Sequence, residues 1–126
     1  MKKKEKITNL FVEYPSCSTC QKAKIWLIEN LIEFDARDIV DFTPNEAELK
    51  EWISKSGLDI DKWFNTNGIT FKNLRVKDRL QILTDDEKIK LLASNGMLIK
   101  RPILVSEKGV LLGFKKAEWE SMLLKK

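Results

Sequence analysis

The sequence predicts an α/β fold in which helices flank a four-stranded mixed sheet. A strand–helix–strand pattern over residues 7–39 implies a parallel strand pair, because parallel strands need a crossover connection. Two short apolar runs within residues 103–112 imply an antiparallel hairpin. The stretch between these regions has helical patterns, and helices packed on such a sheet give the α/β class. With 126 residues, the chain is expected to form one domain over residues 1–126.

The first strand is expected over residues 7–14 and the second over residues 33–39. Apolar side chains recur at every second position of the first segment, as they do on a half-buried strand. Pro15 ends this strand, because proline has no N–H for a strand ladder. The face toward the core is expected to carry Leu10, Val12 and Tyr14.

The helix between these strands is expected to begin at Ser18, because Ser18 and Gln21 have the spacing of a capping box. Apolar residues recur along it at helical spacing, which predicts one buried face. That face is expected to comprise Cys20, Ala23, Leu27 and Leu31, with Trp26 beside them.

The middle of the chain is expected to be helical. Thr43 and Pro44 fit the N-cap and the first position of a helix that ends at Gly57. Thr84 and Glu87 have capping-box spacing and open another helix. The remaining expected features of this region are a helical turn at 59–64, a helix at 76–83 and a helix end at Gly96.

The end of the chain is expected to complete the sheet. Residues 103–105 and 110–112 are apolar, and residues 106–109 between them suit a hairpin loop. A terminal helix is expected over residues 116–124, with Trp119 and Leu123 on one face.

The composition excludes several classes of site. The chain has no histidine and two cysteines, so it lacks both a Ser-His-Asp triad and a Cys-His pair. A structural zinc site would lack half of its usual ligands. The net charge is +4, but lysine and glutamate are interspersed, and no basic cluster carries the aromatic residues of a nucleic-acid groove.

The sequence also predicts where the protein works. No segment approaches the length of a membrane span, and the basic residues 1–6 precede no secretory leader pattern. We therefore expect a cytoplasmic monomer that binds neither membranes nor nucleic acid directly.

The motif Cys17-Ser18-Thr19-Cys20 lies where a strand passes into a helix. The first helical turn offers unpaired N–H groups and the positive end of the dipole, which stabilise a thiolate. Cys17, at the leading edge, is the expected nucleophile, and Cys20 is the expected resolving partner. A C-x-x-C pair in this context is typical of a thioredoxin-like redox motif, although buried unreactive thiols and a metal site are alternatives.

Lys100-Arg101-Pro102 precedes the third expected strand. Pro102 has two interpretations from the residues alone. It could open an edge strand, where a missing N–H costs little, or form a cis peptide bond packed against the cysteines.

Four segments resemble the ArsC/Spx family of thioredoxin-fold proteins, in order and with family-like spacing. They are residues 14–23, 64–68, 98–103 and 110–114. The resemblance implies a thioredoxin-like core with a helical insertion at about 43–96, a cis-Pro102 and an Arg101 that points toward the thiols. It also implies that the substrate site comprises Ser18, Thr19, Asn65 and Pro102 beside Cys17, Cys20 and Arg101.

The family includes arsenate reductases coupled to glutathione and glutaredoxin, which hold the oxyanion with three arginines. This chain matches that pattern at Arg101, whereas the middle position falls near Asn65 and the last near Gly113. Because a tetrahedral anion needs several charge-assisted donors, we expect poor arsenate reduction. The second cysteine is instead typical of the Spx-like branch, whose namesake is a redox-sensing regulator that contacts RNA polymerase.

Three functions therefore follow from the resemblance. The first is a thiol–disulfide oxidoreductase that acts on a small thiol or a protein disulfide. The second is a redox-sensing regulator that binds the RNA polymerase alpha subunit, and the third is an arsenate reductase. No bound cofactor is expected, and the electron donor would be glutathione, glutaredoxin or thioredoxin.

Overall fold

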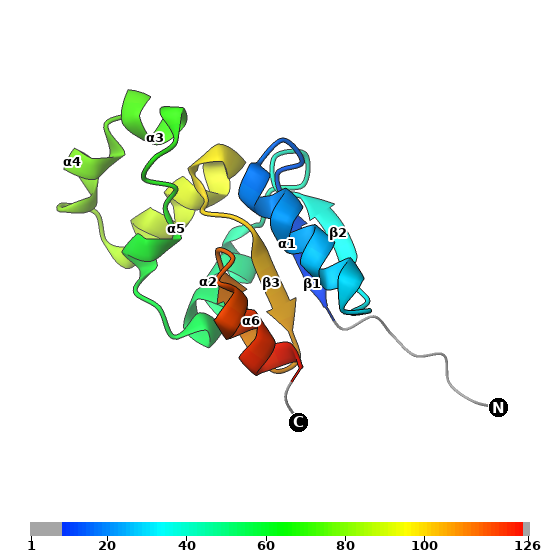
Figure 1. Cartoon of the computed structure of the whole chain (residues 1–126). Coiled ribbons are helices and arrows are strands. Elements are labelled where there is room, and N and C mark those ends of the chain that lie inside the picture. Colours follow the sequence, from blue (N-terminus) through cyan, green and yellow to red (C-terminus); the bar gives the residue numbers. More distant parts are fainter. Residues whose placement is uncertain (1–8, 125–126) are drawn as a thin grey trace.

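The computed structural model describes residues 9–124. Its strands form one four-stranded mixed sheet in the order β2-β1-β3-β4 (Figure 1). β1 pairs in parallel with β2 and antiparallel with β3, and β3 pairs antiparallel with β4. The predicted fold class and the predicted hairpin are therefore confirmed. The strands are β1 (Leu10–Glu13), β2 (Asp35–Asp38), β3 (Ile103–Ser106) and β4 (Gly109–Leu112).

Helices occupy the N-terminal crossover, the long connection between β2 and β3, and the end of the chain (Figure 1). The first strand was predicted from residue 7, and its first two residues lie outside the described part. The helices are α1 (Ser18–Glu29), α2 (Glu46–Ser56), α3 (Ile69–Asn73), α4 (Val76–Leu80), α5 (Asp85–Ser94) and α6 (Lys116–Leu123), with 3-10 turns η1 (Ile60–Trp63) and η2 (Gly96–Leu98).

The sheet separates two apolar cores, because successive side chains of a strand point to opposite faces. Val12 and Ile103 face the helices of the long connection, including Trp52 of α2 and Leu92 of α5. On the other face, a second core packs α1 and α6 against β1, β3 and β4. That second core comprises Phe11, Ala23, Trp26, Leu27, Leu104, Leu111 and Trp119. This arrangement is the thioredoxin-like architecture that the resemblance implied, with the helical insertion on one side of the sheet.

The predicted start of α1 is right, but its predicted cap is wrong. Cys17 is the N-cap, and no side chain caps the helix. The Gln21 amide instead donates a hydrogen bond of 2.9 Å to the Pro15 carbonyl. Leu31 was predicted on the buried face but is 90% exposed, because α1 ends at Glu29 and the chain turns at Leu31 with a φ of 58°.

The start of α2 also differs from the prediction. Asn45, not Thr43, is the N-cap, and it forms a reciprocal capping box with Glu48. The Thr43 hydroxyl instead donates to the carbonyl oxygens of Ile39 and Val40. Thr43 and Asn45 are both suitable N-cap residues, and the local sequence pattern does not show which of them caps the helix. The capping box of Thr84 and Glu87 at α5 and the αL cap at Gly57 are confirmed.

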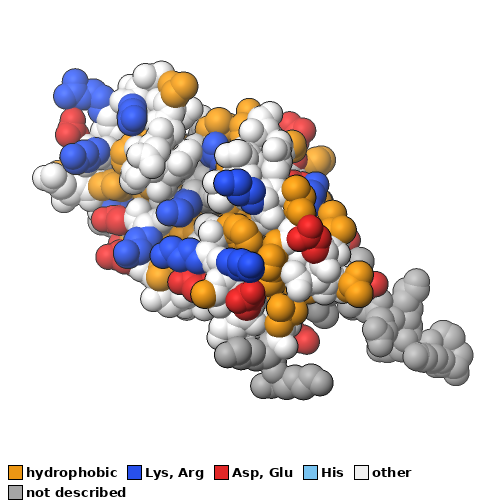
Figure 2. All heavy atoms as spheres, in the orientation of Figure 1, with side chains coloured by type: hydrophobic (Ala, Val, Ile, Leu, Met, Phe, Trp, Pro, Cys, Tyr) orange, Lys and Arg blue, Asp and Glu red, His pale blue; other side chains and the backbone are white. Residues whose placement is uncertain are grey.

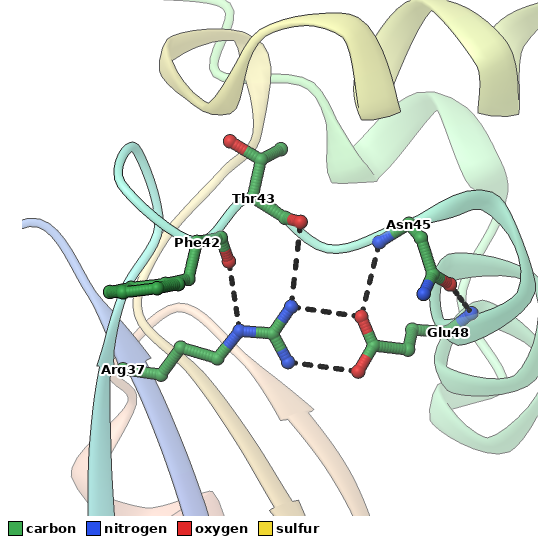
Figure 3. A network of polar contacts seen from close by, with 5 residues as sticks. All are labelled: Arg37, Phe42, Thr43, Asn45 and Glu48. Atoms are coloured by element: carbon green, nitrogen blue, oxygen red, sulfur yellow. Dashed lines mark hydrogen bonds and ion pairs between the residues drawn. The ribbon is translucent and has the colours of Figure 1, made fainter.

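Arg37 of β2 links α2 to the sheet through hydrogen bonds (Figure 3). Both terminal nitrogens of Arg37 donate to the Glu48 carboxylate, at 2.8 and 2.9 Å. Its Nε donates to the Phe42 carbonyl at 2.8 Å. Because Glu48 also accepts from the Asn45 backbone N–H, the same carboxylate joins the cap of α2 to β2.

Gly96 marks a close contact between the end of the long connection and the segment after β2. A Cβ built on Gly96 would lie 2.1 Å from the carbonyl oxygen of Ile39, far inside contact distance. α5 ends at Ser94 and Gly96 begins η2, so Gly96 is required for close approach and is not the predicted helix end. Among residues 9–124, no helix is long and apolar enough to cross a membrane.

Candidate active site

A cleft with a volume of about 320 Å³ opens at the N-terminus of α1. Four chain segments meet there: the start of α1, the loop after η1, the segment before β3 and the end of β4. Each of these four segments contributes polar or charged side chains to the lining of the cleft. The lining residues are Cys17, Thr19, Asn65, Asn67, Lys100, Arg101, Leu112, Gly113, Phe114 and Lys115.

Cys17 is held by backbone hydrogen bonds at the junction of β1 and α1. Its N–H donates to the Tyr14 carbonyl at 2.9 Å, and its carbonyl accepts from the Gln21 N–H at 3.0 Å. The first turn of α1 contains no acidic residue, so no negative charge opposes the positive end of the helix. The thiol is partly exposed and faces the cleft.

The Cys17 thiol is more acidic than an ordinary cysteine. Partial burial works against ionisation, but hydrogen bonds from the Cys20 backbone and thiol, the Thr19 backbone and the Arg101 guanidinium outweigh it and lower the pKa of Cys17. Each of these donors stabilises the thiolate more than the thiol. At a given pH, a larger fraction of Cys17 is therefore thiolate than in a free cysteine.

Cys20 has the opposite environment. Its side chain is fully buried on α1. Burial, together with the hydrogen bond to and the charge of Cys17, raises the pKa of Cys20 to about 12. Both cysteines are free thiols. The pair thus combines a partly exposed thiol with a lowered pKa and a buried thiol with a raised pKa.

Arg101 lines the cleft and lies over the ring of Tyr14. Its guanidinium carbon is 5.1 Å from the centroid of the Tyr14 ring. Its Nη1 donates to the carbonyl oxygens of Met97 and Ile99, at 3.3 and 3.4 Å. Arg101 is also close enough to Cys17 to help lower the pKa of its thiol.

Pro102 follows a cis peptide bond, and its carbonyl accepts a hydrogen bond of 2.8 Å from the Gly113 N–H. The cis interpretation of Pro102 is therefore correct. Pro102 is buried and does not line the cleft.

Asn65 is fixed in the cleft wall by the backbone and by a neighbouring glycine. Its N–H donates to the Leu98 carbonyl at 2.8 Å. A Cβ on Gly68 would lie 2.6 Å from the Asn65 Nδ2, so Gly68 leaves room for the Asn65 amide. The backbone pairing of Phe64 with Ile99 holds this loop against the segment that carries Arg101.

The structure brings together four of the predicted site residues: Cys17, Thr19, Asn65 and Arg101. Ser18 is exposed outside the cleft lining, and Cys20 lies buried behind Cys17. Sequence reasoning missed Tyr14 and Asn67 as site residues. Tyr14 was assigned to the core face of β1, but its carbonyl accepts from the Cys17 N–H and its ring contacts Arg101.

Another hollow of the described residues is not lined by either thiol. It measures about 640 Å³, lies between η1 and α3–α4, and shares Asn67 with the cleft. Within residues 9–124, no group of three or more cysteine, aspartate or glutamate side chains converges in a way that could hold a metal ion.

Comparison with known proteins places this geometry in context. Residues 12–122 match the model of the ArsC family. A Bacteroides fragilis protein of known structure, described as ArsC family related, is 54% identical, with a TM-score of 0.89 over 91% of this chain and 97% of that one. A Streptococcus mutans protein described as a possible arsenate reductase is 44% identical, with a TM-score of 0.82 over 88% of this chain and 94% of that one.

Curated relatives include an uncharacterized protein and two regulators. The uncharacterized YusI of Bacillus subtilis is 44% identical over 87% of this chain and 93% of its own. The regulatory protein MgsR of Bacillus subtilis is 37% identical over 92% of this chain and 90% of its own. The global transcriptional regulator Spx 2 of Bacillus anthracis is 31% identical over 86% of this chain and 81% of its own.

Proposed function

Because the chain belongs to the ArsC family, we propose that it is a thiol–disulfide oxidoreductase with Cys17 and Cys20 as its redox pair. The observation that carries this proposal is the contrast between the two thiols. Cys17 is exposed to the cleft with a lowered pKa, whereas Cys20 is buried behind it with a raised one. A nucleophilic thiol must be accessible and readily ionised, whereas a resolving thiol can remain protonated until the mixed disulfide has formed.

The proposed reaction begins with attack of the Cys17 thiolate on a substrate disulfide. The substrate S–S bond breaks, one substrate thiolate leaves and takes up a proton, and a mixed disulfide forms at Cys17. The Cys20 sulfur, losing its proton, then attacks the Cys17 sulfur and releases the second substrate thiol. Two electrons pass to the substrate, and the Cys17–Cys20 disulfide remains. A small thiol or a protein dithiol such as glutathione, glutaredoxin or thioredoxin would reduce it again.

The cleft residues have separate roles in this proposal. Arg101 stabilises the Cys17 thiolate, and Thr19 and Asn65 offer hydrogen-bonding groups to the substrate beside it. The buried Pro102 shapes the wall of the site. The reaction needs no bound cofactor, since the protein itself carries the electrons, and it suits a reducing compartment such as the cytoplasm.

A trapping experiment tests the redox pair. In Cys20→Ser, the mixed disulfide at Cys17 has no resolving thiol, so substrates should accumulate as covalent adducts that mass spectrometry detects. Cys17→Ser is the matched control and should trap none. Mild peroxide should convert the wild type to an intramolecular disulfide with a loss of two hydrogens. Equal trapping by both variants, or oxidation only to sulfinic acid, contradicts the proposal.

A second candidate is a redox-sensing regulator, which the names of two relatives favour. In this case, formation of the Cys17–Cys20 disulfide would alter a protein-binding surface, and the RNA polymerase alpha subunit is the proposed partner. Pull-down with the C-terminal domain of the alpha subunit separates the two functions. Redox-dependent binding supports the regulator, and disulfide turnover without binding supports the enzyme.

Arsenate reduction is the weakest candidate. Arg101 is the one arginine among the described residues that line the cleft, beside Lys100 and Lys115. Each missing charge-assisted hydrogen bond costs about 1.5–3 kcal/mol, so the loss of two slows turnover by about two to four decades. A coupled assay with glutathione, glutaredoxin and NADPH tests this. Turnover within about tenfold of a family member with three arginines would contradict it.

A further inference from the structure

The cleft at Cys17 continues into a second hollow. This hollow measures about 390 Å³ and shares Lys100, Leu112 and Lys115 with the cleft. It runs from the thiol toward η1 and is lined further along by Lys62 and Phe64. The two hollows therefore form one groove, which we call the lysine groove, with Cys17 near one end.

The walls of the lysine groove carry unbalanced positive charge. Lys62, Lys100 and Lys115 are exposed, and the ion pairs among residues 9–124 include none of the three. Figure 2 shows Lys and Arg side chains gathered across this face of the molecule.

Acidic side chains do little to offset this charge. Two carboxylates, Asp61 and Glu118, line the outer part of the groove, and Asp61 is already paired with Lys88 at 2.7 Å. The cleft around Cys17 has no acidic lining residue within the described part of the chain.

The groove also has an apolar floor. Leu58, Phe64 and Leu112 also line it, and Phe64 and Leu112 are buried. A floor of this kind with a rim of cations suits a polypeptide segment better than an inorganic anion, because the segment can bury aliphatic groups while its carboxylates meet the ammonium groups.

We propose that the lysine groove binds an acidic polypeptide segment that adjoins the substrate cysteine. This inference rests on the proposed oxidoreductase function and names its substrate class. The substrate disulfide lies at Cys17, and aspartate or glutamate residues next to it extend along Lys100, Lys115 and Lys62. The bonds exchanged at Cys17 and Cys20 are those of the reaction above.

Electrostatic attraction of this kind acts mainly on the rate of encounter. Clefts lined by one sign of charge raise association rates by about tenfold or more, and salt screens the effect. An acidic substrate should therefore react faster than an uncharged one at low salt, and the advantage should shrink as salt is added.

The test compares peptides that differ only in the residues flanking one cysteine: acidic, uncharged or lysine-rich. Each cysteine is capped as a mixed disulfide with 2-thiopyridine, whose release by the reduced wild-type protein is followed by absorbance. Mercaptosuccinate capped in the same way tests a small dicarboxylate. Rates are measured at low salt and at about 0.3 M salt.

The matched variants remove three positive charges each. One carries Lys62→Gln, Lys100→Gln and Lys115→Gln, and the other carries Lys50→Gln, Lys90→Gln and Lys108→Gln at exposed positions outside the groove. We expect an acidic-to-uncharged rate ratio of about ten or more in the wild type and in the second variant, falling toward one in the first variant and in high salt.

The outcomes separate this inference from the function on which it rests. If the acidic and uncharged peptides react at equal rates, or if the rate ratio falls equally in the two variants, the lysine groove does not bind acidic segments. Either result leaves the proposed oxidoreductase function intact. If capped mercaptosuccinate reacts faster than the uncharged peptide by as much as the acidic peptide does, the ligand of the groove is a small anion and not a polypeptide segment. Failure to react with any capped thiol overturns both proposals.

Discussion

At the scale of single residues, the two thiols have different properties because different groups surround them. Cys17 receives hydrogen bonds at the start of α1 and from Arg101, which lower its pKa. Cys20 lies three positions further on the same helix, where burial keeps it protonated. The chemistry of the pair therefore depends on groups within the C-x-x-C motif at the start of α1 and, in addition, on Arg101, which lies outside the motif.

The first prediction concerns Arg101. Arg101→Gln should raise the pKa of Cys17, because it removes a cationic hydrogen-bond donor from the thiolate. At a pH below the pKa of Cys17, alkylation of Cys17 should slow by roughly tenfold, since a hydrogen bond to a charged group contributes about 1.5 kcal/mol or more. In a Cys20→Ser background, thiolate absorbance measures the pKa of Cys17, and reaction with iodoacetamide measures its alkylation rate. Arg79→Gln, at an exposed site outside the cleft, should change neither.

The second prediction concerns Tyr14, whose ring lies against the Arg101 guanidinium. Tyr14→Leu should slow Cys17 alkylation by about two- to fivefold below the midpoint, because a cation–π contact near the surface contributes about 0.5–1 kcal/mol. Tyr14→Phe keeps the ring and should behave as wild type. In an Arg101→Gln background, Tyr14→Leu should add nothing. A full effect in that background would mean that Tyr14 acts independently of Arg101.

At the scale of elements, side-chain links across the chain hold the helices of the long connection to the sheet. The Arg37–Glu48 pair joins β2 to the cap of α2 (Figure 3). Within the long connection, Lys88–Asp61 joins α5 to η1. Arg37 and Glu48 are both largely shielded from solvent, and the guanidinium binds the carboxylate through two hydrogen bonds. Such a two-point pair contributes more than a typical surface ion pair.

The third prediction follows from the Glu48 carboxyl, whose pKa Arg37 lowers through its hydrogen bonds. A lowered pKa in the folded state stabilises the fold above the pKa of an unfolded glutamate, and this contribution is lost as pH falls through the folded pKa. Glu48→Gln should thus reduce the free energy of unfolding by about 1–2 kcal/mol at neutral pH and by less in acid.

Urea denaturation at neutral and acidic pH measures this difference. Glu46→Gln is the control, because Glu46 occupies the same first turn of α2 but forms no ion pair among the described residues. An equal effect of the two substitutions at neutral pH would show that the helix dipole, not Arg37, accounts for the stabilisation.

At the scale of the whole molecule, the sequence predicts the parts that local patterns encode. The shared face of Leu10, Val12 and Tyr14, the hairpin and the capping box at Thr84 all follow from neighbouring residues, and all are confirmed. The wrong cap at Ser18, the exposed Leu31 and the unpredicted helix α3 depend on how the chain turns after each element. Likewise, the motif predicts Cys17 and Cys20, whereas the contact of the Tyr14 ring with Arg101 is a tertiary contact that no spacing encodes.

The fourth prediction tests the contact between the two ends of the long connection. Gly96→Ala should lower the free energy of unfolding by more than about 2 kcal/mol, because a Cβ would collide with the Ile39 backbone, which cannot move as a side chain can. Gly57→Ala is the comparison. Its φ of 71° is unfavourable for alanine, but no atom lies within 4 Å, so the loss should be about 1 kcal/mol. Equal losses would contradict the collision.

The position of the cleft between the two cores has a consequence for how such proteins diverge. The reactive thiol belongs to α1, which packs on one face of the sheet, whereas Asn65 and Lys62 belong to the long connection on the other face. Substitutions in the long connection can therefore change which partner is selected without altering the packing that holds the thiols. This separation suits a family whose members include a possible arsenate reductase and a regulatory protein.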